Sequence, residues 1–252
     1  MKHVPRFYIS NSGFVGDSLA VDAIITLHKS QMHHAINVLR MAIGDHVRIF
    51  NEHFGEWDCS ICDVKKNTLI CNKMISTPYE NDQHKNVEIA FSLIHQNRIS
   101  ILLEKITELG VTKIFLLKSQ HSQYKNVNME KLQQIVVGAC EQCGRIDIPK
   151  IFPPENLQDF LKKHEGKTTL LVADEKSDEN SKKMPDLLNS KYIFIVGPEG
   201  GFSDEERALF DQSSSVERIS LGKRILRSET AAIICVASQS IWSWWSQGDS
   251  NP

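Results

Sequence analysis

The chain has 252 residues, enough for one large domain or two small ones. Of these, 41% are hydrophobic and 24% are charged, which is an ordinary composition for a globular protein. The net charge of −2 neither favours nor excludes nucleic-acid binding, because that binding depends on a local basic patch and not on the total charge. Since no apolar run approaches the roughly 18 residues of a membrane span and the N-terminus has no signal-peptide core, we expect a cytoplasmic protein.

The pattern of residues 1–76 predicts short strands joined by turns, with one helix. The strands are expected at 6–9, 23–27, 46–50, 56–64 and 68–74, and the helix at 33–41. Several short strands with one helix suggest a small β-barrel domain. Residues 77–86 are polar and lack periodicity, so we expect a linker there.

Basic and aromatic side chains gather in this N-terminal segment. Arg6 and Arg40, with nearby histidines and with Phe7 and Tyr8, would form the kind of face that RNA-binding modules use for phosphate contacts and base stacking. The alternative is a set of solvated surface residues. The residue types alone do not decide between the two.

Residues 87–252 alternate predicted strands with predicted helices. Strands are expected at 87–93, 112–117, 168–173, 192–196 and 216–221, and helices at 98–109, 129–143, 157–164, 204–211 and 228–245. Gly110 and Gly144 are expected to end two of the helices, and Ser203 with Glu206 predicts a capping box. This alternation is typical of an α/β domain with a mostly parallel sheet.

The six cysteines include two C-x-x-C pairs, Cys59 with Cys62 and Cys140 with Cys143. Residues three apart in a strand face opposite sides, and the second pair lies in a helix-like run without a partner pair. In a chain without an export signal, reduced thiols are expected. We therefore predict no metal site.

Three of the predicted strands end in polar or glycine-rich sequence. Asp174 and Glu175 follow the first, GPEGG (197–201) the second and LGKR (221–224) the third. Because ligands of parallel sheets bind beyond the carboxyl ends of the strands, these segments predict one crevice. Glycine, which has no Cβ, would let a ligand approach the main chain there. The alternative reading is a set of tight turns.

The residue types also narrow the ligand. The segment 197–206 lacks the lysine of a P-loop, its glycines come late for a dinucleotide fold, and Glu199 would repel phosphate. A ligand with an adenosine part and a cationic or neutral centre, such as S-adenosylmethionine, fits better. Arg227 and Glu229 flank the start of the last helix, where arginine can hold an anionic oxygen or simply form a surface ion pair.

At these residues the chain resembles a known family. GPEGGFSDEE (197–206) followed by ISLGKRILRSETAA (219–232) is similar to the signature of the bacterial 16S ribosomal RNA uracil-N3 methyltransferases, which belong to the SPOUT superfamily of knotted methyltransferases. HVPRFYI (3–9), ELGVTKI (108–114) and EQCGR (141–145) resemble other motifs of this family, and they follow one another along the chain in the order that the family has. The resemblance covers nearly the whole chain.

The resemblance implies a C-terminal trefoil-knot methyltransferase domain over residues 87–252 and a PUA-like RNA-binding barrel over 1–76. It also implies a homodimer with the cofactor site beside its interface. S-adenosylmethionine is the implied cofactor, and 16S ribosomal RNA of the small ribosomal subunit is the implied substrate. The residues that it assigns to the cofactor are Leu171, Val196, Gly197, Gly201, Leu221, Gly222, Ile225, Leu226, Thr230 and Ala231.

The expected RNA contacts are Arg6, Arg40, Arg145 and Arg224. Two positions depart from the family pattern. His95 stands where the family often has a lysine, and His121 stands where it often has an arginine. Both changes remove a permanent positive charge expected near the substrate groove.

The implied reaction removes the proton from uracil N3 and transfers a methyl group to it. Arg227 is the expected cation that favours the uracil anion, and the base is Glu199, Glu229 or water. N3 lies on the Watson–Crick edge, so the target must be unpaired or flipped out. The alternatives are a knotted methyltransferase acting on another base or on a ribose 2′-oxygen, and a non-catalytic RNA-binding protein that kept the fold.

Overall fold

A computed structural model describes residues 4–10, 19–77, 87–122, 124, 126–175 and 192–248 of the chain, with side chains up to residue 239. The chain divides into two units, the first formed by residues 1–83 with 140–148 and the second by residues 84–139 with 149–252. The predicted linker at 77–86 lies outside the described residues except for Thr77.

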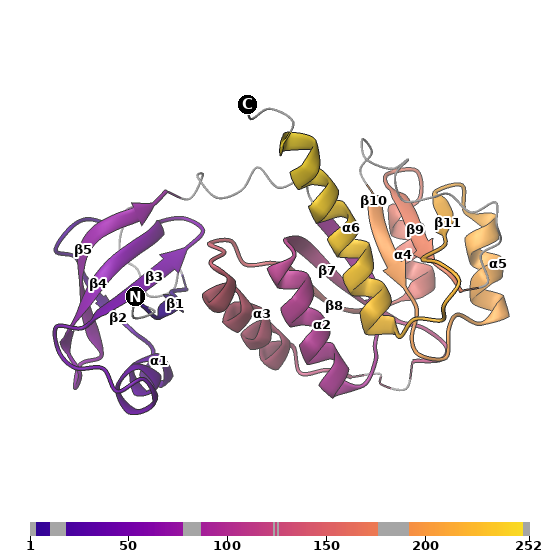
Figure 1. The fold of residues 1–252 in the computed structure, drawn as a ribbon. Helices are drawn as coiled ribbons and strands as arrows, with labels where there is room; N and C mark the ends of the chain where they lie inside the picture. The colour runs from indigo at the N-terminus through magenta and orange to yellow at the C-terminus, as the bar shows by residue number, and fades with distance from the viewer. Residues whose placement is uncertain are drawn as a thin grey trace. The chain divides into compact units, whose positions relative to one another are not determined.

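The first unit contains a five-stranded sheet in the order β1-β3-β4-β5-β2 (Figure 1). Its strands are β1 (Arg6–Tyr8), β2 (Ile24–Thr26), β3 (His46–Asn51), β4 (Gly55–Asp63) and β5 (Thr68–Ser76). β1 pairs with β3 in parallel, and the other neighbours are antiparallel. Register shifts between β4 and β5 bend the strands, which curls the sheet. All five predicted strands are confirmed.

The helix of the first unit begins earlier than predicted. It consists of α1 (Lys29–His33) followed by a π-helical turn, η2 (His34–Val38). The His28 side chain accepts a hydrogen bond from the Ser30 N–H, and the main-chain N–H of His28 donates to the Gln31 side chain. This capping arrangement starts the helix at residue 29, so the predicted start at residue 33 was wrong.

The second unit is built on a six-stranded sheet in the order β11-β9-β10-β6-β7-β8, in which every neighbouring pair is parallel. The predicted parallel α/β architecture is therefore confirmed. Its strands are β6 (Val87–Ser92), β7 (Val111–Lys118), β8 (Lys150–Asn156), β9 (Thr169–Ala173), β10 (Tyr192–Val196) and β11 (Val216–Ile219). Its helices are α2 (Gln96–Glu108), α3 (Met129–Cys143, of which residues 140–143 belong to the first unit), α4 (Leu157–His164), α5 (Asp204–Gln212) and α6 (Ser228–Gly248).

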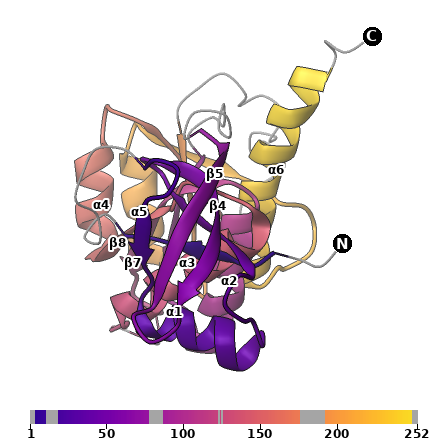
Figure 2. The same ribbon diagram turned by 90° about the vertical axis from the view of Figure 1, so that its left-hand side faces the viewer.

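Helices cover both faces of this sheet. Figures 1 and 2 show α2 and α6 on one face and α4 and α5 on the other. Alternate strand residues such as Ile193, Ile195 and Leu170 pack with Phe160 of α4 and Phe210 of α5 in one buried cluster. Because both faces are covered, the central strands are apolar throughout rather than alternating.

The chain crosses the sheet after its last strand. β11 lies at one edge, yet α6 packs against α2, β6 and β10 near the middle. The segment between β11 and α6 therefore passes over the carboxyl ends of β9 and β10. The trefoil threading implied by the family resemblance requires such a crossing.

Candidate active site

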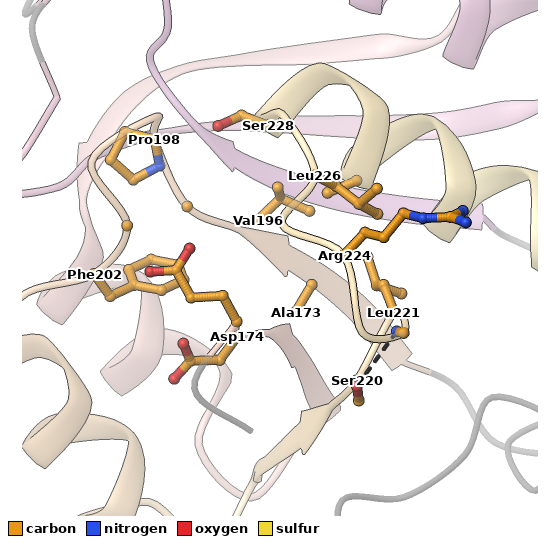
Figure 3. Close-up of a pocket in the computed structure, with 15 residues that line it drawn as sticks. Ala173, Asp174, Val196, Pro198, Phe202, Ser220, Leu221, Arg224, Leu226 and Ser228 are labelled. Atoms are coloured by element: carbon orange, nitrogen blue, oxygen red, sulfur yellow. Dashed lines mark hydrogen bonds between the residues drawn. The ribbon is translucent and has the colours of Figure 1, made fainter. Parts of the chain in front are cut away.

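A pocket opens at the carboxyl ends of β9 and β10 and beside the segment that follows β11 (Figure 3). Ala173 and Val196, the last residues of β9 and β10, line it, and so do Leu226, two residues before α6, and Ala231 in the first turn of α6. The empty space at this site, open mouth included, is about 580 Å³. The crevice predicted from the strand ends is therefore present.

The loop after β10 brings bare main chain to this pocket. A Cβ on Gly197 would lie 3.0 Å from the ring of Phe202, which is buried. Gly201 has a φ of 66°, and its N–H donates to the Pro198 carbonyl at 2.9 Å. Positive φ favours glycine at that position, so the loop carries no side chain of its own there.

Contacts from α5 and from the loop after β7 hold the GPEGG loop (197–201) in place. The Ser203 hydroxyl accepts from the Glu206 N–H at 3.1 Å, and Glu206 accepts from the Ser203 N–H at 2.9 Å, which confirms the predicted capping box. Glu206 also accepts from the Gln120 N–H at 2.8 Å. His121 Nδ1 lies 3.2 and 3.1 Å from the last two carbonyl oxygens of the GPEGG loop. His121 therefore supports this loop.

The segment after β11 forms another wall of the pocket. The Gly222 N–H donates to the Ser220 hydroxyl at 3.3 Å, which is the dashed bond in Figure 3. Gly222 has a φ of 107°, so this turn also requires glycine. Leu221 and Arg224 line the pocket from the same segment.

A buried acid, Asp174, also lines the pocket. Its side chain is 1% exposed, and both its oxygens accept from Arg207 at 3.2 Å, while Arg218 Nη1 lies 3.4 Å from Oδ2. Burial lowers the pKa of Arg207, but the hydrogen bond and charge of Asp174 outweigh that effect and raise the pKa above its ordinary value. The carboxylate is thus neutralised by protein groups and is not a free anion in the pocket.

A second, more open hollow is lined by His95, Asn97, Arg98 and Glu199. His95 caps α2, because its Nδ1 accepts from the Asn97 N–H at 3.3 Å. Its ring also meets Tyr124 edge-on, with ring centroids 5.3 Å apart. His95 thus fixes the first turn of α2, which presents Arg98.

Arg98 lies between two acids at this hollow. Its Nη1 is 3.5 Å from Glu199 Oε1 and 3.9 Å from Glu229 Oε2. Glu229 Oε2 is buried and has no hydrogen-bond partner among the described residues. Pro198 and Ser228, the neighbours of the two acids in sequence, line the first pocket, so pocket and hollow adjoin. Sequence reasoning missed Arg98, whose helical spacing gives no sign of its partners.

The predicted cofactor residues fall into two groups. Those that line the pocket are Val196, Gly197, Gly201, Leu221, Gly222, Leu226 and Ala231. Leu171 is buried inside β9, Ile225 is 85% exposed and Thr230 is exposed, so these three lie outside the lining. The lining residues that were not predicted to bind the cofactor, besides Asp174 and Glu175, are Ala173, Pro198, Phe202, Ser220, Arg224 and Ser228. Most of them adjoin predicted residues, which is the signal that could have found them.

The predicted catalytic residues are also divided. Glu199 and Glu229 meet at Arg98. Arg227 is exposed, and its carbonyl accepts from the Ala231 N–H at the start of α6. The structure thus brings the two candidate bases together around a different arginine.

Arg6, a predicted RNA contact, is buried in the first unit. Its guanidinium donates to Glu56 at 3.0 Å and to the carbonyl oxygens of Cys140 at 2.7 Å and Gly144 at 3.2 Å. It also lies 4.3 Å from the centroid of the Phe50 ring. These contacts give Arg6 a structural role, and RNA binding by it stays a prediction.

The other predicted RNA contacts differ in exposure. Arg145 forms an ion pair with Asp147, and its side chain is 11% exposed. Arg40 is exposed and has an unusual φ of 56°. Arg224 is exposed at the rim of the pocket. Arg40 and Arg224 are therefore the two of the four that are free to meet a large partner.

Comparison with known proteins identifies the family. A family model described as an RNA methyltransferase domain matches residues 81–240, and one described as an RNA methyltransferase PUA domain matches residues 28–73. The chain belongs to this RNA methyltransferase family. Ribosomal RNA small subunit methyltransferase E of Rickettsia conorii is 35% identical over 233 residues, which cover 90% of this chain and 93% of that methyltransferase.

Solved structures of methyltransferases agree. A ribosomal RNA small subunit methyltransferase E from Neisseria gonorrhoeae, bound to S-adenosyl methionine, matches with a TM-score of 0.79 at 27% identity and covers 95% of this chain and 98% of its own. A putative methyltransferase of Legionella pneumophila in complex with the same cofactor matches with a TM-score of 0.79 at 28% identity, with the same coverage. The fold class expected from the resemblance, a methyltransferase domain with a parallel sheet and a PUA-like domain, is confirmed.

Two absences concern the described residues alone. Within them no group of three or more His, Cys, Asp and Glu side chains is placed to hold a metal ion. In that same part of the chain, no helix combines the length and the apolar character needed to cross a membrane.

Cys59 is buried and Cys62 is exposed, which confirms that the two thiols of this C-x-x-C pair face opposite sides.

Proposed function

We propose that this protein transfers a methyl group from S-adenosylmethionine to N3 of a uridine in 16S ribosomal RNA of the small ribosomal subunit. The observation that carries the proposal is the pocket of bare glycine main chain at the carboxyl ends of β9 and β10. The names of the relatives, small subunit methyltransferases of ribosomal RNA, support the substrate class. The choice of uracil N3 rests on the family resemblance of the sequence.

The residues of the pocket fit such a cofactor. Val196, Leu226 and Ala231 offer apolar surface for an adenine ring, and the glycine turns offer N–H and C=O groups for its polar edge. Glu175, whose side chain is 46% exposed at the pocket, suits ribose hydroxyls. When bound, the cofactor would supply an electrophilic methyl group.

The chain must then orient the base and remove its proton. N3 gives its proton to a carboxylate such as Glu199 or Glu229, its electron pair forms the new bond to the methyl carbon, and the pair of the broken carbon–sulfur bond leaves with sulfur. A nearby cation would stabilise the negative charge on the base. The pocket and the hollow adjoin, so acids and methyl donor would lie close together, as proximity requires.

Further features of the sequence prediction join this proposal. We infer a homodimer with the cofactor site beside its interface, a cytoplasmic location, and an RNA-holding role for the first 76 residues. Arg40, which is exposed in the first unit, supports that role. Because N3 lies on the pairing edge, a separate RNA-holding domain would help to present an unpaired uridine.

Methyl transfer from labelled cofactor tests the proposal. Purified small ribosomal subunits and naked 16S RNA, both from cells lacking this modification, would be incubated with the protein, and their nucleosides separated by mass spectrometry. We expect the label in N3-methyluridine. Label in a 2′-O-methylated nucleoside or another base would support the rival methyltransferase activities. Absence of both transfer and cofactor binding would support a non-catalytic RNA-binding protein.

A further inference from the structure

The arginine in the hollow beside the pocket is held loosely. The contacts of 3.5 and 3.9 Å between Arg98 and the two acids are longer than the roughly 2.7–2.9 Å of a strong charge-assisted hydrogen bond. Among the described residues, the contact with Glu199 is its one side-chain hydrogen bond. A guanidinium has five N–H donors, so most of those on Arg98 are available to a ligand in the hollow.

We propose that this hollow receives the acceptor uracil and that Arg98 is the catalytic cation that stabilises the uracil anion. The proposal rests on the proposed function and deepens it. Arg98 projects from the first turn of α2 into a hollow that it shares with Glu199. It replaces Arg227, which the sequence suggested for this role, because Arg98 faces both candidate bases.

The chemistry of uracil matches this set of groups. N3 lies between two carbonyl groups, and loss of its proton spreads negative charge onto their oxygens. An arginine donor aimed at one of these oxygens stabilises that charge as it develops. The proton from N3 passes to an adjacent carboxylate, and Glu229 Oε2 is buried without a hydrogen-bond partner among the described residues. One cation and one proton acceptor are what the step needs.

The walls of the hollow suit a flat ring. His95 lines the hollow, and its ring meets the ring of Tyr124 edge-on, with centroids 5.3 Å apart. Unpaired bases in RNA-binding sites commonly stack on such rings. His95 is exposed and Tyr124 is half-buried, so both are accessible to a base. The position where the family often has a lysine thus holds an aromatic ring, and Arg98 supplies the charge.

The variant Arg98→Gln tests the proposal in the full-length protein. The Arg98 side chain is 34% exposed and its ion pairs are long. The variant should therefore fold with an unchanged melting temperature. With small ribosomal subunits and saturating S-adenosylmethionine, we expect kcat to fall about 100-fold, as when an oxyanion donor is removed. The rate of methyl transfer should rise at a higher pH than in the wild type, because uracil gives up its N3 proton less readily without the cation beside its anion. The cofactor Kd, measured by calorimetry, should stay unchanged.

Lys105→Gln on the same helix is the matched control, because Lys105 is exposed and pairs with Glu108. It should keep the wild-type kcat. An Arg98→Gln protein with the wild-type kcat and pH profile would overturn the proposal. Equal losses of cofactor affinity and kcat would also overturn it, because they would indicate that Arg98 only supports the structure of the site. If Arg98→Gln does not fold, Arg98→Lys must lose kcat about tenfold, because lysine lacks the planar fork of donors, and a wild-type kcat would contradict the proposal. No transfer by the wild-type protein would instead refute the proposed function.

Discussion

The pocket and the adjoining hollow are built by different means. The pocket is lined by glycine main chain and apolar side chains at strand ends, and its buried acid is neutralised by Arg207 and Arg218. The hollow is lined by polar and charged side chains, and Arg98 there meets acids from two other elements. The difference suggests a division of labour, in which main chain holds a cofactor and side-chain charge acts on the base.

The largest effect is expected from Asp174→Asn. This change leaves two guanidinium groups beside the pocket without their shared carboxylate, which is 1% exposed. Removing one partner of a buried ion pair typically costs about 3–5 kcal/mol, so we expect a loss of that size in the free energy of unfolding. Urea denaturation measures it.

Asp211→Asn is the matched control for this prediction. Asp211 pairs with the same Arg218 at 2.7 Å, but its side chain is 69% exposed. Exposed pairs contribute less than about 1 kcal/mol, so this variant should be nearly as stable as the wild type. If Asp174→Asn were fully stable and lost cofactor affinity alone, the pocket too would act through charge, and the comparison would break.

The same contrast explains what the sequence could predict. The glycine turns at 197–201 and 222 were found because a strand that ends at glycine is a local pattern. Arg98 and Glu199 are 101 residues apart, and Asp174 and Arg207 are 33 apart. No periodicity connects such residues, because the fold alone brings them together. The crossing of α6 back to the centre of the sheet is likewise a property of topology.

Two local errors have local causes. β8 (Lys150–Asn156) was not predicted, because Pro153 and Pro154 lie in it and proline argues against a strand. It lies at the edge of the sheet, where missing N–H donors are tolerated. The start of α1 was missed because His28, an uncommon N-cap, replaces the usual serine or aspartate.

Gly201→Ala is expected to have a smaller effect on stability and a specific effect on cofactor binding. Its Cβ would lie 2.9 Å from Glu175 Oε1, which must then move within the pocket. We expect the Kd for S-adenosylmethionine to rise about tenfold, which is about 1.4 kcal/mol. Gly166→Ala is the matched control, because its φ of 68° is close to the 66° of Gly201 and a Cβ there meets nothing within 4 Å. Both variants should lose about 1–2 kcal/mol of stability to backbone strain, but Gly166→Ala should bind normally.

The smallest effect is expected at His164, away from both sites. Burial, and then the charge of Lys163, lower the pKa of His164 below its ordinary value of 6.5. The folded protein therefore holds His164 neutral more strongly than the unfolded chain does, which stabilises the folded state above pH 6.5. This contribution is lost as the pH falls through the lowered pKa that His164 has in the folded protein. His164→Gln should flatten the decline in unfolding free energy between neutral and mildly acidic pH. Methyl transfer at neutral pH should be unchanged, and a fall in kcat would show that the site extends to α4.

The most direct test of the division of labour compares Gly201→Ala with Arg98→Gln in one pair of assays. The cofactor Kd would be measured by calorimetry, and kcat would be measured on small ribosomal subunits at saturating cofactor. We predict that Gly201→Ala raises Kd and keeps most of kcat, whereas Arg98→Gln keeps Kd and loses kcat. If both variants lost the same property, pocket and hollow would act as a single site, which would contradict the division of labour between them.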